Sequence, residues 1–289
     1  MDAGHRLELA AGDGAVVVAH RFDAQAPRGV VVVGPALAVP QAFYFDFAAW
    51  LAQQGFTAIT FDYRGIGHAA PRSLRGFQAS IDDWIRRDYE AAVVEARRLA
   101  GTLPLSVVGH SMGAQLVPLL PSSAEVDAML AVAGGSGYWR GFPPATRPFI
   151  LAMHYGAVPL ALPVAGYFPG RRLRMLGDLP AGVMRQWRRW CMHADYLVGV
   201  EPGAREAYAR ARFPLLSLTF SDDRMMTQRN VDALQAHLRG VRRESRRISP
   251  AEAGGPIGHM GFFRRRYRET LWPIALEWLA AQRRRGARR

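Results

Sequence analysis

The chain contains no lysine and only one cysteine, Cys191. A single cysteine excludes a disulfide within the chain, and residues 1–14 contain no apolar segment typical of a secretory signal. Both observations predict a cytoplasmic location.

All 37 basic residues are therefore arginines, which with 24 acidic residues give a formal net charge of +13. The arginines are scattered along the chain. Their densest group is the terminal run 283–289, which we expect to be frayed. This distribution predicts no nucleic-acid partner and only weak attraction to anionic surfaces.

Charge is also absent from Pro148 to Gly170, which contain no Asp, Glu, Lys or Arg. A membrane-spanning helix needs about 20 apolar residues. However, Pro159, Pro163 and Gly166 should break such a helix, and His154 lies inside it. We therefore expect no stable membrane span. The stretch favours a lipophilic lid over a binding site, with transient contact with a membrane surface as the weaker alternative.

A length of 289 residues and 49% hydrophobic content allow one large domain with an insertion. Patterns typical of strands alternate with patterns typical of helices. Strands are predicted at 7–10, 15–22, 29–33, 56–61, 103–108, 126–133, 213–220 and 241–249, and helices at 41–54, 80–100, 227–238 and 261–283.

The alternation predicts an α/β fold with a mostly parallel sheet of about eight strands flanked by helices. It stops at about Gly137 and resumes at Phe213. We therefore expect residues 137–212 to form an inserted, mainly helical cap between two parts of one core, 1–136 and 213–289.

The central motif is Gly109-His110-Ser111-Met112-Gly113, which follows a buried strand and precedes a helix. A G-x-S-x-G pattern in this context predicts a nucleophile elbow, a sharp turn that projects the Ser111 hydroxyl from the sheet edge. Glycines two positions before and after the serine let the strand and helix approach closely. In a chain with 29 glycines the bare pattern also arises by chance, so its context carries the interpretation.

A serine nucleophile needs a base and an acid that orients the base, both after later strands of this fold. His259 follows the last predicted strand, and Asp222 and Asp223 follow the strand before it. We favour Asp223 as the acid because of its position before the next helix, and expect Asp222 to cap a helix or to pair with Arg224. The choice between the two aspartates stays open.

An oxyanion hole needs two backbone N–H groups. Met112, at the start of a helix, is the first predicted donor. Pro35 has no N–H, so Ala36 is the second predicted donor and Leu37 the fallback. Residues near this site are candidate substrate contacts: Leu37, His110, Tyr138, Trp139 and His68.

The chain resembles the α/β-hydrolases, in particular their serine aminopeptidase-like and monoglyceride-lipase-like branch. The matching motifs are Gly109-His110-Ser111-Met112-Gly113, Asp62-Tyr63-Arg64-Gly65-Ile66-Gly67, Ser221-Asp222-Asp223 and Gly258-His259-Met260-Gly261. Segments 135–139, 166–170 and 179–183 resemble an uncharacterised group of predicted bacterial hydrolases. The resemblance implies a Ser–His–Asp triad with no metal and no organic cofactor.

Two positions depart from the pattern of these hydrolases. Gly34-Pro35 stands where His-Gly usually precedes the oxyanion donor, so we expect a change in the oxyanion hole. His68 stands where a serine usually follows the Gly-x-Gly turn, which makes it a candidate to reach into the site.

These patterns predict a serine hydrolase that cleaves a carboxylic ester, or less often an amide, through an acyl-enzyme on Ser111. Apolar residues of the cap favour a small to medium lipophilic substrate: Phe142, Phe149, Ile150, Leu151, Leu160 and Leu162. One alternative is an acyltransferase with the same triad, and another is a ligand-binding scaffold without turnover. The sequence determines neither the natural substrate nor the oligomeric state.

Overall fold

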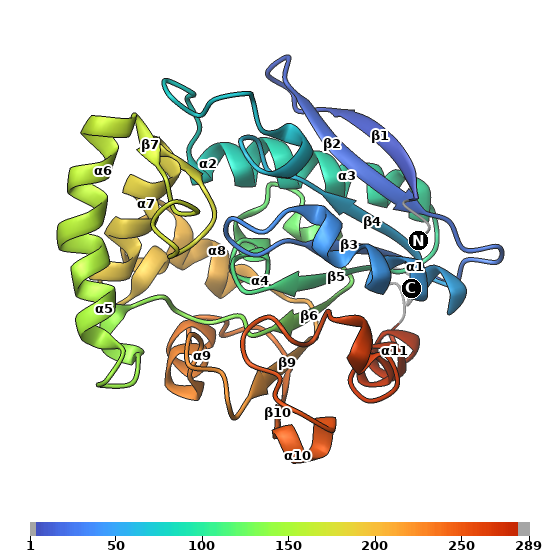
Figure 1. Ribbon diagram of the computed structural model, residues 1–289. Helices are drawn as coiled ribbons and strands as arrows, with labels where there is room; N and C mark the ends of the chain where they lie inside the picture. Colours follow the sequence, from blue (N-terminus) through green and yellow to red (C-terminus); the bar gives the residue numbers. More distant parts are fainter. Residues whose placement is uncertain (1–3, 283–289) are drawn as a thin grey trace.

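In the computed structural model, which describes residues 4–282, eight strands pair into one sheet in the order β1-β2-β4-β3-β5-β6-β9-β10 (Figure 1). β2, which the Gly12-Asp13-Gly14 turn joins to β1, runs antiparallel to both of its neighbours, β1 and β4, and all other neighbouring strands are parallel. The strands are β1 His5–Ala10, β2 Val16–Phe22, β3 Val30–Gly34, β4 Thr57–Phe61, β5 Leu105–His110, β6 Ala128–Val132, β9 Leu215–Phe220 and β10 Arg243–Ile248. The predicted mostly parallel α/β fold is confirmed.

Helices cover both faces of this sheet because the central strands are apolar on both sides. In β3, Val30 and Val32 pack in one core, whereas Val31 and Val33 pack in the other. The first core includes side chains of α3 (Glu90–Ala100). The second includes side chains of α1 (Phe45–Gln53), α9 (Gln228–Gln235) and α11 (Trp272–Ala280).

The helix predicted at 80–100 begins where its sequence indicates. Ser80 accepts a hydrogen bond from the N–H of Asp83, and the Asp83 carboxylate bonds back to Ser80, so the capping box is complete. The helix is continuous, with α2 (Ile81–Asp83), a π-helical segment η3 (Trp84–Tyr89) and α3. The expected helix at 41–54 likewise starts as a 3₁₀ turn, η1 (Gln41–Tyr44), before α1.

Helices make up most of the chain between β6 and β9. They are η6 Trp139–Gly141, α5 Arg147–Ala152, η7 Met153–Ala157, α6 Val158–Ala165, α7 Ala181–Met192, η8 Tyr196–Gly199 and α8 Ala204–Arg210, with a two-stranded ribbon of β7 Tyr167–Phe168 and β8 Leu179–Pro180. Figure 1 places α5, α6 and α7 beyond α4 (Met112–Gln115), at the end of the sheet where β5 leads into Ser111.

The expectation that prolines break the apolar stretch is wrong. α5, η7 and α6 join into one continuous helix, Arg147–Ala165, hereafter the apolar helix. Pro159 is the second residue of α6, which follows the π-helical segment η7, and Pro163 lies inside α6. The helix ends at Gly166, which adopts the left-handed conformation with φ 78°.

The last predicted helix starts later than expected. Residues from Gly261 onward form turns and the 3₁₀ segment η9 (Arg265–Tyr267), and α11 begins only at Trp272. Pro273 lies in its first turn, where a proline favours a helix start. The remaining helices and 3₁₀ turns are α10 Pro250–Ala253, η2 Gly67–Ala69, η4 Val117–Leu119 and η5 Ser123–Glu125. The arginine run 283–289, which we expected to be frayed, lies outside the described residues.

Candidate active site

Ser111 occupies the predicted sharp turn between β5 and α4. Its backbone has φ 49° and ψ −113°, a conformation that L-residues rarely adopt. The glycines two positions before and after Ser111 are required because a larger residue would not fit there. A Cβ at Gly109 would lie 2.5 Å from the backbone nitrogen of Ala114, and one at Gly113 would lie 2.1 Å from the carbonyl oxygen of Gly34. The elbow is therefore tight enough to hold Ser111 in its strained conformation.

His259 and Asp223 meet although they are far apart in the chain. Nδ1 of His259 lies 2.8 Å from Oδ2 of Asp223. A carboxylate can only accept, so Nδ1 carries the proton and Nε2 is left as the basic nitrogen. The other carboxylate oxygen, Oδ1, accepts from the N–H groups of Met225 and Met226 at 2.8 and 2.9 Å. These bonds fix the carboxylate, which in turn fixes the imidazole.

The Asp222 side chain makes a different contact from the one we expected. Its Oδ2 accepts a hydrogen bond from the N–H of Ile257 at 2.8 Å, in place of the predicted helix cap or pair with Arg224. Because Ile257 lies two residues before His259, this contact anchors the loop that carries the histidine.

Ser111 and His259 line the same cavity, whose volume is about 270 Å³. Both side chains are mostly covered, and Ser111 is 9% exposed. The wall is largely apolar. Its other lining residues are Ala36, Leu37, Ala38, Val39, Gln115, Gly137, Phe142, Met175, Leu176, Gly177, Trp187, Tyr196, Met225, Met226 and Met260.

Only Leu37 among the five predicted substrate contacts lines this cavity. His110 is fully buried behind the elbow. His68 is largely exposed and packs near His20, and Tyr138 and Trp139 pack against each other outside the cavity lining. The sequence analysis missed the methionines of the wall. Met260 directly follows the candidate base, and Met225 and Met226 lie two and three residues after the candidate acid, which was the available signal.

The predicted oxyanion donor Ala36 is already engaged. Its N–H donates to the Tyr44 hydroxyl at 2.9 Å, so the prediction for Ala36 needs correction, although Ala36 does line the cavity. The N–H of Leu37, the fallback, has no acceptor among residues 4–282. The N–H of Met112 has no helical acceptor because it begins α4. In the sheet, Gly34 pairs with Gly109, which brings these two segments side by side.

His110 connects these segments to the histidine loop. Its Nε2 lies 2.9 Å from the carbonyl oxygen of His259, and its Nδ1 lies 2.8 Å from the Tyr44 hydroxyl. A carbonyl only accepts, so Nε2 donates and Nδ1 accepts the Tyr44 proton. Burial lowers the pKa of His110 to about 3, helped by the nearby His259, which keeps the ring neutral. The bonds run in one direction from Ala36 through Tyr44 and His110 to His259.

A second set of hydrogen bonds joins the cavity wall to the elbow helix. The indole N–H of Trp187 donates to the Tyr196 hydroxyl at 3.1 Å, and that hydroxyl donates to Oε1 of Gln115 at 3.1 Å. The Gln115 amide donates to the carbonyl of Gly135 at 2.7 Å. Two aromatic residues of the segment between β6 and β9 are thereby fixed against α4, close to Ser111.

The motif that begins at Asp62 stabilises the fold and lies outside the cavity lining. The buried Asp62 carboxylate accepts from the backbone and side-chain nitrogens of Gln41 and from the N–H of His68. A Cβ at Gly67 would lie 2.3 Å from this carboxylate. Arg64 forms ion pairs with Asp88 and Asp13. The motif thus ties the turn after β4 to the start of η1.

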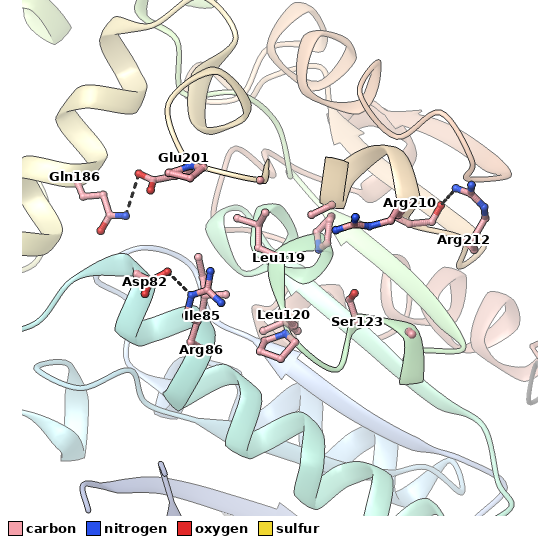
Figure 2. Close-up of a pocket in the computed structure, with 17 residues that line it drawn as sticks. Asp82, Ile85, Arg86, Leu119, Leu120, Ser123, Gln186, Glu201, Arg210 and Arg212 are labelled. Carbon is pink, nitrogen blue, oxygen red and sulfur yellow. Dashed lines mark hydrogen bonds and ion pairs between the residues drawn. The ribbon is translucent and has the colours of Figure 1, made fainter. Parts of the chain in front are cut away.

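A larger cavity of about 880 Å³ lies elsewhere, between α2, η4, α7 and α8 (Figure 2). Several of its polar groups are already paired: Arg86 with Asp82, Gln186 with Glu201, and Arg212 with backbone carbonyls. None of the candidate catalytic residues lines it. In the part of the chain that the structure describes, no cluster of three His, Cys, Asp or Glu residues is arranged to hold a metal ion.

Comparison with known proteins gives a match to the family described as serine aminopeptidase, S33, over residues 14–154. This range contains the elbow and ends before Asp223 and His259. No curated protein sequence matches the chain.

Several solved structures are similar over nearly their whole length. A soluble variant of monoglyceride lipase from Saccharomyces cerevisiae has a TM-score of 0.66 at 14% identity, covering 97% of this chain and 95% of that one. A carboxyl esterase from Bacillus coagulans has a TM-score of 0.61 at 14% identity, covering 97% and 99%. A monoacylglycerol lipase from Paleococcus ferrophilus has a TM-score of 0.58 at 14% identity, covering 91% and 98%.

These TM-scores show a shared fold. At 14% identity they do not show a shared reaction, which has to be argued from the residues of the site. The family match spans 141 of the 289 residues, whereas the first two of these structures each cover 97% of the chain. This protein therefore has the fold of the α/β-hydrolases.

Proposed function

We propose that this chain is a serine hydrolase that cleaves a carboxylic ester through an acyl-enzyme on Ser111. One observation carries the proposal: His259, held by Asp223 at 2.8 Å, lines the same cavity as the strained Ser111. A hydroxyl is a weak nucleophile without such a base, and an imidazole needs an acid to fix its tautomer.

In the acylation step, the Ser111 oxygen attacks the ester carbonyl carbon while Nε2 of His259 accepts the hydroxyl proton. The carbonyl oxygen becomes an oxyanion, which the N–H groups of Met112 and Leu37 stabilise. Asp223 stabilises the imidazolium through its bond to Nδ1. The tetrahedral intermediate then collapses, the bond to the alcohol oxygen breaks, and His259 gives its proton to the leaving alcohol.

In the deacylation step, a water molecule attacks the acyl-enzyme carbonyl and His259 accepts its proton. The second tetrahedral intermediate releases the carboxylic acid, and the proton returns from His259 to the Ser111 oxygen. The chemistry assigned to these residues requires neither a metal nor an organic cofactor.

The cavity supports a small-molecule ester with one lipophilic part. Its wall is mainly methionine, leucine and aromatic side chains, and about 270 Å³ is near the lower limit for small-molecule sites. Phe142, Met175, Leu176, Trp187 and Tyr196 come from residues 137–212, which supports the proposal that this segment caps the active site. The similar structures named as lipases and esterases agree with this substrate class.

We also propose a cytoplasmic location.

The test is hydrolysis of p-nitrophenyl esters of increasing acyl length by the wild type and by Ser111→Ala. We expect turnover by the wild type and a loss of about 10³-fold or more in the variant. A fluorophosphonate probe should label the wild type and leave the variant unlabelled. Equal rates for both proteins on every ester, together with no labelling, would refute the proposal.

A further inference from the structure

The outer face of the apolar helix, Arg147–Ala165, is uncovered and entirely apolar. Two of the cap residues that we expected to favour a lipophilic substrate are exposed instead, Phe149 at 51% and Leu160 at 72%, and Val164 is 77% exposed. All exposed residues on this helix are apolar or aromatic. They are Pro148, Phe149, Ala152, Tyr155, Pro159, Leu160, Pro163 and Val164, and at helical spacing they share one side. Figure 1 shows α5 and α6 at the left margin of the molecule.

The burial of this helix differs from that of a core helix, which protein covers on all sides, and from that of a membrane span, which lipid surrounds. It has the length and composition of a membrane span, yet in its most apolar window only 22% of residues are buried. Its inner side packs on the protein through Met153, His154, Val158 and Leu162. The Arg188 side chain donates to the carbonyl of His154 at 2.6 Å. A helix held on one side and apolar on the other suits an interface between water and lipid.

Arginines flank the apolar helix in the sequence, and two others contact it. Residues 128–177 contain no Asp or Glu, and their only charged side chains are Arg140, Arg147, Arg171, Arg172 and Arg174. The last three are exposed and follow the C-terminal end of the helix. Arg75 donates to the carbonyl of Val164, and Arg188 lies over the Tyr155 ring at 5.2 Å. Cations around an apolar face complement the anionic head groups of a bilayer.

Two side chains in contact, His154 and Trp187, connect the apolar helix to the candidate active-site cavity. His154, on the inner side of the helix, packs against Trp187 with ring centroids 5.3 Å apart, and Trp187 lines the cavity. Met175, Leu176 and Gly177, directly after the exposed arginines, also line it. A lipid surface against this helix would therefore lie beside the cavity wall.

We propose that the outer face of the apolar helix docks this protein on the surface of an anionic lipid bilayer, with the apolar side chains at the acyl-chain boundary and the arginines among the head groups. The docking is peripheral, because the inner side of the helix stays packed on the protein. It does not depend on the proposed ester hydrolysis.

The test is co-sedimentation with vesicles of phosphatidylcholine alone and of phosphatidylcholine mixed with phosphatidylglycerol. All variants carry Ser111→Ala, so that hydrolysis of lipid cannot alter the vesicles. We expect binding to the mixed vesicles that weakens as salt rises. The double variant Leu160→Glu/Val164→Glu should bind about tenfold more weakly, because two charged side chains would enter the apolar layer. Arg171→Gln/Arg172→Gln/Arg174→Gln should lose most of the preference for phosphatidylglycerol.

Val94→Glu is the matched control. Val94 lies on α3 and is 53% exposed, so the same change there should leave binding unchanged. Circular dichroism checks that each variant is folded. The proposal is overturned if the Ser111→Ala protein does not sediment with the mixed vesicles, or if Val94→Glu weakens binding as much as the double variant. It is also overturned if the protein is a dimer in solution that Leu160→Glu/Val164→Glu dissociates, since a second copy would then cover this face.

Discussion

Nε2 of His110 lies 2.9 Å from the carbonyl oxygen of His259, so the residue before the candidate nucleophile is bonded to the backbone of the candidate base. The G-x-S-x-G pattern leaves this second position open, and here a buried neutral imidazole occupies it. Its other nitrogen accepts from Tyr44, which also accepts from Ala36. The loop of the candidate base and the loop of the oxyanion donors are thus held by one set of bonds.

Tyr44→Phe should destabilise the protein, because removing one hydroxyl leaves both the Ala36 N–H and Nδ1 of His110 buried without a partner. We expect a loss of about 1–3 kcal/mol in the free energy of unfolding, measured by denaturant titration. The value of kcat/KM on a p-nitrophenyl ester should also fall. Tyr138→Phe is the control, since Tyr138 lies outside this set of bonds. Equal stability of Tyr44→Phe and wild type would contradict the hydrogen-bond assignment.

Asp223→Asn should lower kcat by about 10³–10⁴-fold. The asparagine amide can donate to Nδ1 of His259 and so stabilise the wrong tautomer of the imidazole. Asp222→Asn should have a much smaller effect, since its side-chain oxygen still accepts from the N–H of Ile257. Initial rates of the two variants on one ester give the comparison. If Asp223→Asn stays active while Asp222→Asn is inactive, the two aspartates have exchanged roles.

His154→Leu should raise stability at neutral pH and reduce its acid sensitivity. Both ring nitrogens of His154 are buried without a hydrogen-bond partner among residues 4–282. Burial, with the nearby Arg188, lowers the pKa of His154 to about 4. A free histidine has a pKa of about 6.5, so the unfolded chain binds the proton more readily. Stability is therefore lost as the pH falls from about 6.5 towards 4.

Denaturant titrations at pH 7.5 and 4.5 measure this difference. At pH 7.5 we expect the free energy of unfolding of the variant to exceed that of wild type by about 1 kcal/mol. Between pH 7.5 and pH 4.5, the free energy of unfolding should fall by about 2 kcal/mol less in the variant than in wild type. His110 still contributes acid sensitivity in both proteins, because its pKa is also lowered, to about 3. An unchanged difference between the two pH values would show that His154 binds its proton as readily in the folded chain as in the unfolded one, which would contradict its lowered pKa.

Leu176→Ala should shift the preferred ester towards longer acyl chains, because Leu176 lines the cavity beside Ser111. We expect the ratio of kcat/KM for long over short esters to rise about tenfold, the effect typical of one or two methylene groups. Leu173→Ala is the matched control, since Leu173 is 41% exposed and lies outside the lining. A shift of the same size in both variants would exclude a direct contact between Leu176 and the acyl chain.

The elements that the sequence predicted well are those with a local pattern. Four successive valines in β3 indicate a strand buried on both faces, and Ser80 with Asp83 predicts a capping box. The order of Ser111, Asp223 and His259 after successive strands could also be predicted, because parallel strands bring their carboxyl ends to one edge.

Other features depend on contacts between distant residues. Nothing near Ala36 in the sequence indicates that the hydroxyl of Tyr44 takes up its N–H. In the apolar helix nearly every position is apolar, so the sequence contains no periodicity to separate the inner side from the outer face. The expected substrate-facing residues Phe149 and Leu160 therefore proved to be exposed.

The outer face of the apolar helix also bears on how the rate would depend on substrate. A protein held on a bilayer meets its substrate by lateral diffusion, so the governing quantity is the mole fraction of substrate in the surface and not its concentration in the buffer. Adding inert lipid at constant total substrate would then slow the reaction by dilution in two dimensions. A water-soluble ester, which reaches the cavity from the buffer, would be turned over at the same rate throughout.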